Sequence, residues 1–456
     1  MNTLLPVNNF YKKILRIALP AIAGLSTQMV VSLVDTAMVG RLDEATYALA
    51  AMGIGVLATW ALISFFSSLA TGTHVIVARR FGQKDYVECG NTLNNSLLIS
   101  LSIGIIVAAI GAFFAKPISD LFASDDQVAF YASEYIFYRF LGIPFFLISV
   151  SYRGFYFGIS KTKIFMISGI ITNLLNIIFN YIFIFGNFGM PRMGLAGAGF
   201  GSTLASSFDF FFYTAIMLLP SYRNKFQNFR KIKFDLDVIK SIWKISIPVS
   251  LQNVFILIGF LIFVAITGII GTKQQAATQA TISTLFISFL PCFGFGIAVQ
   301  TLVGNNLGAG KLNLAKIYGI ETAKVATIYT LALGVIFILM PQYVLLMITN
   351  DTSIIEVAKP ALRIAGFAQI FYAIGVVLAN ALQAAGKMLF VMKAEVITNL
   401  FILVPLSYLF GVVLGYGLTG AWVAMPIYII IYSGIILFKY LSNDWYEKIP
   451  LKNQKL

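Results

Sequence analysis

Twelve apolar segments follow one another along the chain, and each is long enough to cross the hydrocarbon core of a membrane, which takes about 20 helical residues. Only 11% of the residues are charged, far below the share of about a quarter that is usual in soluble domains. We therefore expect an all-α polytopic membrane protein with little structure outside the membrane and no soluble catalytic domain. The predicted transmembrane helices are 15–39, 47–75, 91–114, 128–157, 164–185, 195–219, 242–268, 277–303, 317–340, 356–384, 390–413 and 418–438.

The basic residues show how these helices are oriented. The net charge of +14 is concentrated in alternate loops, beginning with Lys12. The intervening loops hold only Arg41, Lys116, Arg192 and Lys273. This asymmetry is the positive-inside pattern, and it predicts that both termini face the cytoplasm. We expect a multi-pass protein of the inner (cytoplasmic) cell membrane, and we exclude nucleic acid as a partner because the charge is accounted for by orientation.

One polar stretch divides the chain into two similar halves. The predicted N-terminal lobe is 1–220 with six helices, the cytoplasmic linker is 221–241, and the predicted C-terminal lobe is 242–456 with six more. "ILRIALP" at 14–20 matches "IWKISIP" at 242–248, and "VARRFG" at 77–82 matches "VGNNLG" at 303–308. Six helices per lobe predict two lobes related by a pseudo-two-fold axis along the membrane normal, as in transporters built from repeats, with a cleft between them.

Asp35 is a carboxylate inside an apolar helix, in the stretch "MVVSLVDTAMVG". An ionised carboxylate in lipid costs about 2.5 to 3.5 kcal/mol even on lenient scales, so such a residue is functional by default. Gln28 and Ser32 precede it by seven and three residues, which places all three side chains on one face of the helix. We expect Asp35 to couple transport to a proton or cation, and Gln28 and Ser32 to bind substrate.

Three amides share one face of the fifth predicted helix, in "TNLLNIIFN". They are Asn173, Asn176 and Asn180, at spacings of three and four residues. A rise of 1.5 Å per residue puts Asn180 and Asp35 at similar depth, in the outer half of the bilayer. Buried amides need hydrogen-bond partners, so we expect all three to share the coupling site with Asp35. The alternative is that they only join helices within the membrane.

The sixth predicted helix carries a further polar face, in "GSTLASSFDFFFY". We expect Thr203, Ser206 and Asp209 to bind substrate. Helical rise puts Asp209 nearer to the cytoplasmic half than Thr203. Three roles for Asp209 remain open: a second titrating group, an attraction for cationic substrates, or a partner of Arg153.

Several motifs resemble those of the multidrug and toxic compound extrusion (MATE) family. They are "LPAIAGLSTQMVVSLVDTAMVGRL" at 19–42, "VGNNLGAGK" at 303–311, and the pair "GISKTK" at 158–163 and "QAAGK" at 383–387. The resemblance covers essentially the whole chain, and it is strongest to the bacterial DinF-type branch, which has an acidic coupling residue on the first helix. Where some relatives carry an aspartate on the fifth helix, this chain has Asn180.

The resemblance implies a secondary active antiporter that exports organic, cationic or amphipathic compounds by alternating access of its lobes. It also implies H⁺ as the coupling ion, with Na⁺ as the alternative, and no cofactor. We expect small organic substrates and membrane lipid as partners, and a functional monomer. The alternative function is a lipid or lipid-linked oligosaccharide flippase of the same superfamily. Such a flippase would favour a strongly cationic cleft, whereas the basic residues of this chain lie mainly in loops.

The second half lacks an equivalent of Asp35, because Phe263 occupies the corresponding position. Glu321 and Glu395 are expected at helix starts beside basic loops, so a Na⁺ site in the C-terminal lobe, known in another branch of the family, is disfavoured. His74 is the single histidine, and no metal site is expected. Cys89 and Cys292 are expected to be core residues.

Overall fold

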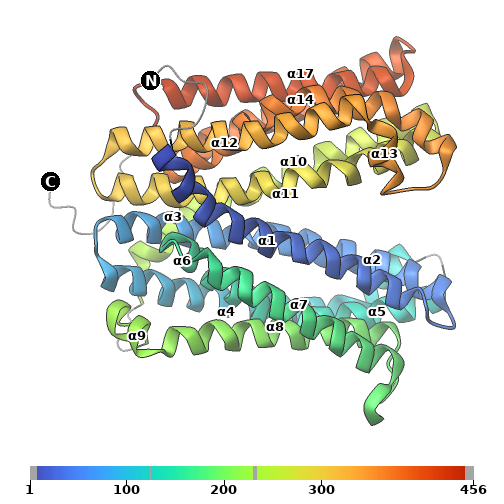
Figure 1. Cartoon of the computed structure of the whole chain (residues 1–456). Coiled ribbons are helices and arrows are strands. Elements are labelled where there is room, and N and C mark those ends of the chain that lie inside the picture. The colour runs from blue at the N-terminus through green and yellow to red at the C-terminus, as the bar shows by residue number, and fades with distance from the viewer. Residues whose placement is uncertain (1–7, 124, 230–233, 447–456) are drawn as a thin grey trace. The chain divides into compact units, whose positions relative to one another are not determined.

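The structure is a computed structural model of the chain that describes residues 8–123, 125–229 and 234–446. The described residues form helices and no strands (Figure 1). Ten helices are long and apolar enough to span a membrane, and two bent helix pairs bring the number of spans to twelve. The predicted all-α architecture is thereby confirmed.

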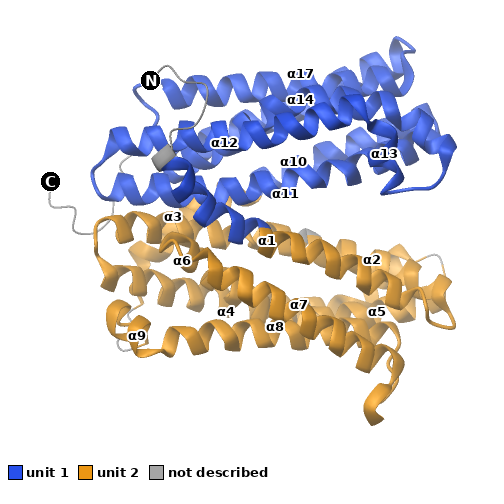
Figure 2. Cartoon of the chain, in the orientation of Figure 1, with its two compact units in different colours: residues 1–22, 251–456 blue, residues 23–250 orange. Residues whose placement is uncertain are grey.

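Contacts divide the chain into two compact units, which Figure 2 shows in different colours. Unit 1 consists of residues 1–22 and 251–456, and unit 2 of residues 23–250. Both boundaries fall within long helices, two residues after a proline: Pro20 in α1 and Pro248 in α10. The compact units therefore differ from a simple division of the chain at the linker, and the predicted lobe boundaries stay a prediction.

Unit 2 contains the first six spans apart from the start of α1. Its second span comprises α2 and α3, its fourth comprises α5 and α6, and its sixth comprises α8 and the short helix α9. The elements are α1 (Asn8–Val39), α2 (Ala45–Phe66), α3 (Ser68–Gly82), α4 (Tyr86–Phe122), α5 (Asp126–Leu141), α6 (Ile143–Gly158), α7 (Thr162–Phe185), η1 (Asn187–Gly189), α8 (Leu195–Leu218) and α9 (Pro220–Phe226).

Unit 1 contains the other six spans apart from the start of α10. The eleventh span of the chain is interrupted by two π-helical turns, η2 and η3. The elements are α10 (Leu236–Ile270), α11 (Thr272–Gly308), α12 (Leu312–Leu339), α13 (Pro341–Leu346), α14 (Thr352–Ala384), α15 (Met388–Thr398), η2 (Asn399–Leu403), α16 (Val404–Tyr408), η3 (Leu409–Val413) and α17 (Gly417–Leu441).

Hydroxyl groups join three helices inside unit 2. Thr73 of α3 lies 2.6 Å from Ser96 of α4, and Ser96 donates to Ser151 of α6 at 2.7 Å. Ser100, one turn further along α4, lies 2.6 Å from the same Ser151 hydroxyl. Lipid supplies no hydrophobic driving force between helices, so small residues and hydrogen bonds such as these hold spans together. They join α3, α4 and α6 within unit 2.

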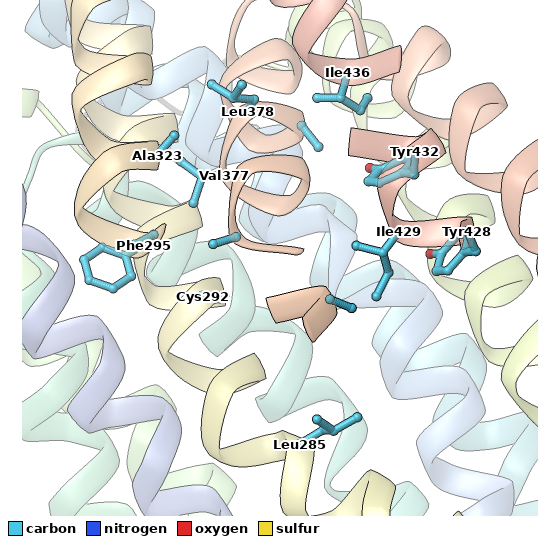
Figure 3. Packing of buried hydrophobic residues seen from close by; sticks show 14 of the residues in the cluster. Leu285, Cys292, Phe295, Ala323, Val377, Leu378, Tyr428, Ile429, Tyr432 and Ile436 are labelled. Carbon is cyan, nitrogen blue, oxygen red and sulfur yellow. The ribbon is translucent and has the colours of Figure 1, made fainter. Parts of the chain in front are cut away.

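The core of unit 1 is made of apolar side chains from α11, α12, α14 and α17. Figure 3 shows part of it, including Phe295 of α11, Val377 of α14, and Ile429 and Ile436 of α17. Cys292 is buried in this cluster, and Cys89 is buried in a smaller cluster of unit 2. Both cysteines lie in apolar surroundings, as expected from the sequence.

Candidate functional site

Asp35 of α1 accepts a hydrogen bond from Asn180 of α7. The carboxamide nitrogen of Asn180 lies 2.7 Å from the Asp35 Oδ1 atom. Asn180 is fully buried, whereas Asp35 is half-buried. Arg139, at the end of α5, acts on Asp35 through its positive charge. The two residues that the sequence places at one depth are therefore in direct contact within unit 2.

The Asn180 side chain is held in one orientation by its neighbours. Its nitrogen also lies 3.3 Å from the carboxamide oxygen of Asn176, one turn earlier on α7. Its own oxygen lies against Gly201 of α8, only 2.3 Å from the position that a Cβ atom would take there. That oxygen has no hydrogen-bond partner among the described residues. Both polar hydrogens of the amide are thus directed at oxygen acceptors, one of which is the Asp35 carboxylate.

The other two asparagines of α7 contact different helices. The Asn176 nitrogen lies 3.2 Å from the hydroxyl of Ser202 on α8. The Asn173 nitrogen lies 2.7 Å from the hydroxyl of Thr27 on α1. Asn173 is therefore joined to α1 two turns away from Asp35, and only Asn176 and Asn180 belong to the same hydrogen-bonded group as the carboxylate.

Gln28 and Ser32 are both exposed on the surface of α1. The backbone oxygen of Ser32 accepts a hydrogen bond from Thr36 at 2.9 Å, one turn further along. Among the described residues, no hydrogen bond joins either side chain to Asp35, so the structure does not bring the three polar residues of this face into one hydrogen-bonded group. Their predicted role in substrate binding stays a prediction.

Asp209 of α8 forms a buried ion pair with Arg153 of α6. The two charged groups are 3.0 Å apart, and the Asp209 side chain is 3% exposed. The hydroxyl of Ser168 on α7 also donates to this carboxylate, and that of Thr172 lies 3.4 Å away. Of the three roles left open for Asp209, the geometry favours the pairing with Arg153, because a paired and hydrogen-bonded carboxylate is already neutralised.

Thr203 and Ser206 have local hydrogen-bond partners. The Thr203 hydroxyl donates to the backbone oxygen of Tyr138 at 2.6 Å. Tyr138 lies just before the 44° bend between α5 and α6 at Gly142, where the Gly142 N–H bonds to Arg139. Ser206 donates to the backbone oxygen of Ser202 at 3.0 Å, within α8. Thr203 thus stabilises a bend, and the predicted substrate role of both hydroxyls stays a prediction.

The two carboxylates of unit 2 have different surroundings. Gly201, beside Asn180, and Asp209 are separated by eight residues of α8, or about 12 Å of helical rise. Asp209 has a cation in contact, whereas Asp35 has an amide donor and remains partly exposed. Asp35 can therefore gain or lose a proton without breaking an ion pair, whereas Asp209 cannot.

Two glutamates of unit 1 are buried, although the sequence predicted both at helix starts beside basic loops. Glu321 is 2% exposed on α12 and pairs with Lys324 at 2.9 Å. Glu395 is 3% exposed on α15, where it accepts a hydrogen bond from the Tyr428 hydroxyl of α17. For Glu395, the tyrosines of the following span are the signal that could have indicated burial.

A metal site is not evident in the described part of the chain, where no three His, Cys, Asp or Glu side chains are grouped to hold an ion. His74 is buried on α3, with its ring 5.7 Å from that of Phe157 on α6.

Twelve helical spans, with hydrogen-bonded carboxylates and amides inside two compact units, define a multi-pass membrane transporter. The MatE family profile matches the chain twice, at residues 20–182 and 248–409. The chain belongs to this multidrug and toxic compound extrusion family, whose members are transporters and not enzymes. The two matched segments also correspond to the two halves of the repeat seen in the sequence.

Curated relatives align over nearly the full length of the chain. A probable multidrug resistance protein NorM of Thermotoga maritima is 26% identical over 454 residues, covering 98% of this chain and 95% of the relative. A protein of the same name from Pseudomonas putida is 25% identical, covering 90% of each. The uncharacterized transporter YisQ of Bacillus subtilis is 25% identical, covering 94% of each.

Solved structures share the fold. MATE in the straight conformation superposes with a TM-score of 0.86 at 20% identity, covering 94% of this chain and 95% of that one. A transporter of the MOP superfamily from Pyrococcus furiosus, described as having a binding pocket of reverse polarity, gives 0.84 at 20% identity, covering 94% of each. These likenesses confirm the predicted twelve-helix, two-lobe fold class.

Proposed function

We propose that the protein is an antiporter that exports organic, cationic or amphipathic compounds in exchange for H⁺, with Asp35 as the coupling residue. The observation that carries this proposal is the contact between Asp35 and Asn180 inside a membrane span. Relatives named multidrug resistance proteins support the export of such compounds. Na⁺ is the alternative coupling ion, and the DinF-type branch is the one that the acidic first helix favours.

The coupling step follows from the electrostatics of this contact. A proton that arrives from outside neutralises Asp35, so the carboxylate loses its attraction for a cationic substrate. The same proton changes the bond with Asn180, because a carboxylic acid is a weaker acceptor than a carboxylate. Substrate release and proton entry are then linked, and each affects the other by the same factor.

Pro20 of α1 is the position at which we expect the first helix to bend. A proline inside a helix removes one backbone hydrogen bond and favours a bend. One end of α1 packs within unit 1 and the other within unit 2, and the boundary falls two residues after Pro20. We expect α1 to bend there when Asp35 changes its protonation, as part of alternating access.

The experiment is transport in liposomes that contain only this protein. A fluorescent organic cation such as ethidium is loaded, and its movement is followed under an imposed pH gradient or an imposed Na⁺ gradient. Asp35→Asn keeps the size and hydrogen bonding of the residue and should abolish gradient-driven movement. Asp43→Asn is the matched control, because Asp43 is 81% exposed and lies outside the site.

The outcomes separate the alternatives. Transport that follows the pH gradient alone and is lost in Asp35→Asn supports the proposal. Transport that follows only the Na⁺ gradient shows that Na⁺ is the coupling ion. Normal transport by Asp35→Asn contradicts the proposal that Asp35 is the coupling residue. The proposed setting is the inner membrane with both termini cytoplasmic, and the proposed working form is the monomer.

A further inference from the structure

Glu395 is a buried carboxyl group that the coupling scheme at Asp35 does not use. It lies on α15 with 3% of its surface exposed, and the Tyr428 hydroxyl of α17 donates to it. Tyr432, one turn further along α17, also directs its hydroxyl at this carboxyl group. Figure 3 shows both tyrosines on α17 among the apolar side chains of the unit 1 core. All of these residues belong to unit 1.

In each half, one of the fifth and sixth spans carries a buried carboxyl group, and the other carries the hydroxyl groups that bond to it. In unit 2 the acid is Asp209 on the sixth span, and hydroxyls come from the fifth. In unit 1 the acid is Glu395 on the fifth span, and hydroxyls come from the sixth. Arg153 neutralises the first acid, whereas no ion pair joins Glu395 to a Lys or Arg in the described part of the chain.

An ionised carboxylate buried without a cation is costly, and such a group takes up a proton instead. Among titratable side chains, those that act on Glu395 are phenols: Tyr428 and Tyr432 of α17, and Tyr372 of α14. Phenols provide hydrogen bonds but no positive charge near neutral pH. Burial without a cationic partner among the described residues therefore favours the neutral, protonated form of Glu395.

A second observation points to the same place. Asn399, one turn after Glu395, is fully buried beside Tyr428 at the start of the π-helical turn η2. Its amide acts on the Tyr428 hydroxyl, but neither of its polar atoms makes a hydrogen bond of ordinary geometry among the described residues. Its oxygen lies 1.5 Å from the position that a Cβ atom would take at Gly259 of α10. Buried amides are rarely left without partners, and π-helical turns are frequent at functional sites.

The repeat explains why the Asn399 amide makes no hydrogen bond of ordinary geometry. The "TN" pair at 398–399 matches the pair at 172–173, so Asn399 corresponds to Asn173. Asn173 bonds to the hydroxyl of Thr27, whereas the position on α10 that corresponds to Thr27 is Phe255. The loss of that partner leaves an amide donor available one helical turn from Glu395.

We propose that Glu395, Asn399, Tyr428 and Tyr432 form a second proton-binding site, located in unit 1 and separate from Asp35. In the neutral state the carboxyl group holds the proton and accepts from Tyr428. On release, the carboxyl O–H bond breaks and the proton passes to water. The carboxylate then accepts from both phenols and from the Asn399 amide. This inference deepens the proposed exchange, since it implies that more than one carboxyl group titrates.

The test is pH-difference infrared spectroscopy of the purified full-length protein, which detects the C=O stretch of protonated carboxyl groups. Wild type should show a carboxyl band that disappears reversibly as the pH is raised, and Glu395→Gln should remove it. Tyr428→Phe should keep the band at a shifted frequency, because the phenol hydrogen bond is lost. Tyr428→Phe also keeps the test valid if Glu395→Gln does not fold.

An exposed glutamate provides the control for the Glu395 band. Glu356→Gln, at an exposed glutamate paired with Lys359, should leave the band unchanged. Identical spectra for wild type and Glu395→Gln, or a Glu395 band that never responds to pH, would overturn the proposal. Loss of the band on adding Na⁺, but not K⁺, at constant pH would show a sodium site instead. Asp35→Asn should retain the Glu395 band, so this result is independent of whether Asp35 couples transport.

Discussion

The carboxamide nitrogen of Asn180 lies 2.7 Å from the carboxylate of Asp35 and joins α7 to α1 inside the membrane. This hydrogen bond links the only acidic residue of the first span to a fully buried amide. It makes the charge of Asp35 depend on the position of α7.

Replacing Asn180 by leucine should impair exchange without unfolding the protein. Hydrogen bonds to charged groups contribute about 1.5 to 3 kcal/mol, so we expect a roughly 10- to 100-fold slower pH-driven exchange. The measurement is organic-cation transport in liposomes at matched protein density.

Asn187→Ala is the control for this series. Its amide lies in the exposed turn after α7 and donates to the backbone of Tyr181. It should transport at the wild-type rate. Normal exchange by Asn180→Leu would contradict the link between the two residues.

Adding one methyl group at Gly201 should displace the Asn180 side chain. A Cβ atom there would lie 2.3 Å from the Asn180 oxygen, closer than real contacts allow. Overpacking of this kind costs about 1 to 3 kcal/mol. We expect Gly201→Ala to lower thermal stability and to slow exchange. Gly53→Ala on α2 is the matched control, because nothing lies within 4 Å of its Cβ position.

The spans and the polar faces could be predicted from the sequence, because each depends on residues along a single helix. Long apolar runs give the spans, and helical periodicity gives the face shared by Asn176 and Asn180. Similar depth in the bilayer led to the prediction that Asp35 and Asn180 share a site, and the structure shows them in contact. The functional roles of these residues remain predictions.

Contacts between helices could not be predicted in the same way. The role of Gly201 depends on how closely α8 approaches α7, which no pattern within α8 indicates. Glu395 is buried because tyrosines of α17 cover it, although its own helix starts near Lys387 and Lys393. The pairing of Asp209 with Arg153 was one of three open alternatives, because several partners were available at that depth.

Asp444 should not contribute to the pH dependence of exchange. Hydrogen bonds from Lys439 and Lys387 lower the pKa of its carboxyl group to about 2. Its stabilising effect is therefore present above the ordinary value of about 4 and is lost only as the pH falls toward 2. Asp444→Asn should show the wild-type pH profile of transport between about pH 5 and 8. A shifted profile would show that the C-terminal end of α17 takes part in coupling.

The ion pair between Asp209 and Arg153 should stabilise unit 2 more than it serves transport. Removing one partner of a buried pair typically costs about 3 to 5 kcal/mol, because the other charge stays buried without compensation. We expect Asp209→Asn to lower the unfolding temperature in detergent, and to reduce exchange less than Asp35→Asn does. The double variant Asp209→Asn/Arg153→Met should recover most of the stability, since it removes both charges.

The exposed pair of Asp43 and Arg192 provides the comparison for this prediction. Its charged groups are 2.7 Å apart, but the side chains are 81% and 54% exposed. Exposed pairs contribute about 0 to 1 kcal/mol, so Asp43→Asn should leave the unfolding temperature almost unchanged. If Asp209→Asn were as stable as Asp43→Asn but lost exchange completely, Asp209 would be a coupling or substrate-binding residue, and its pairing with Arg153 would not be its main role.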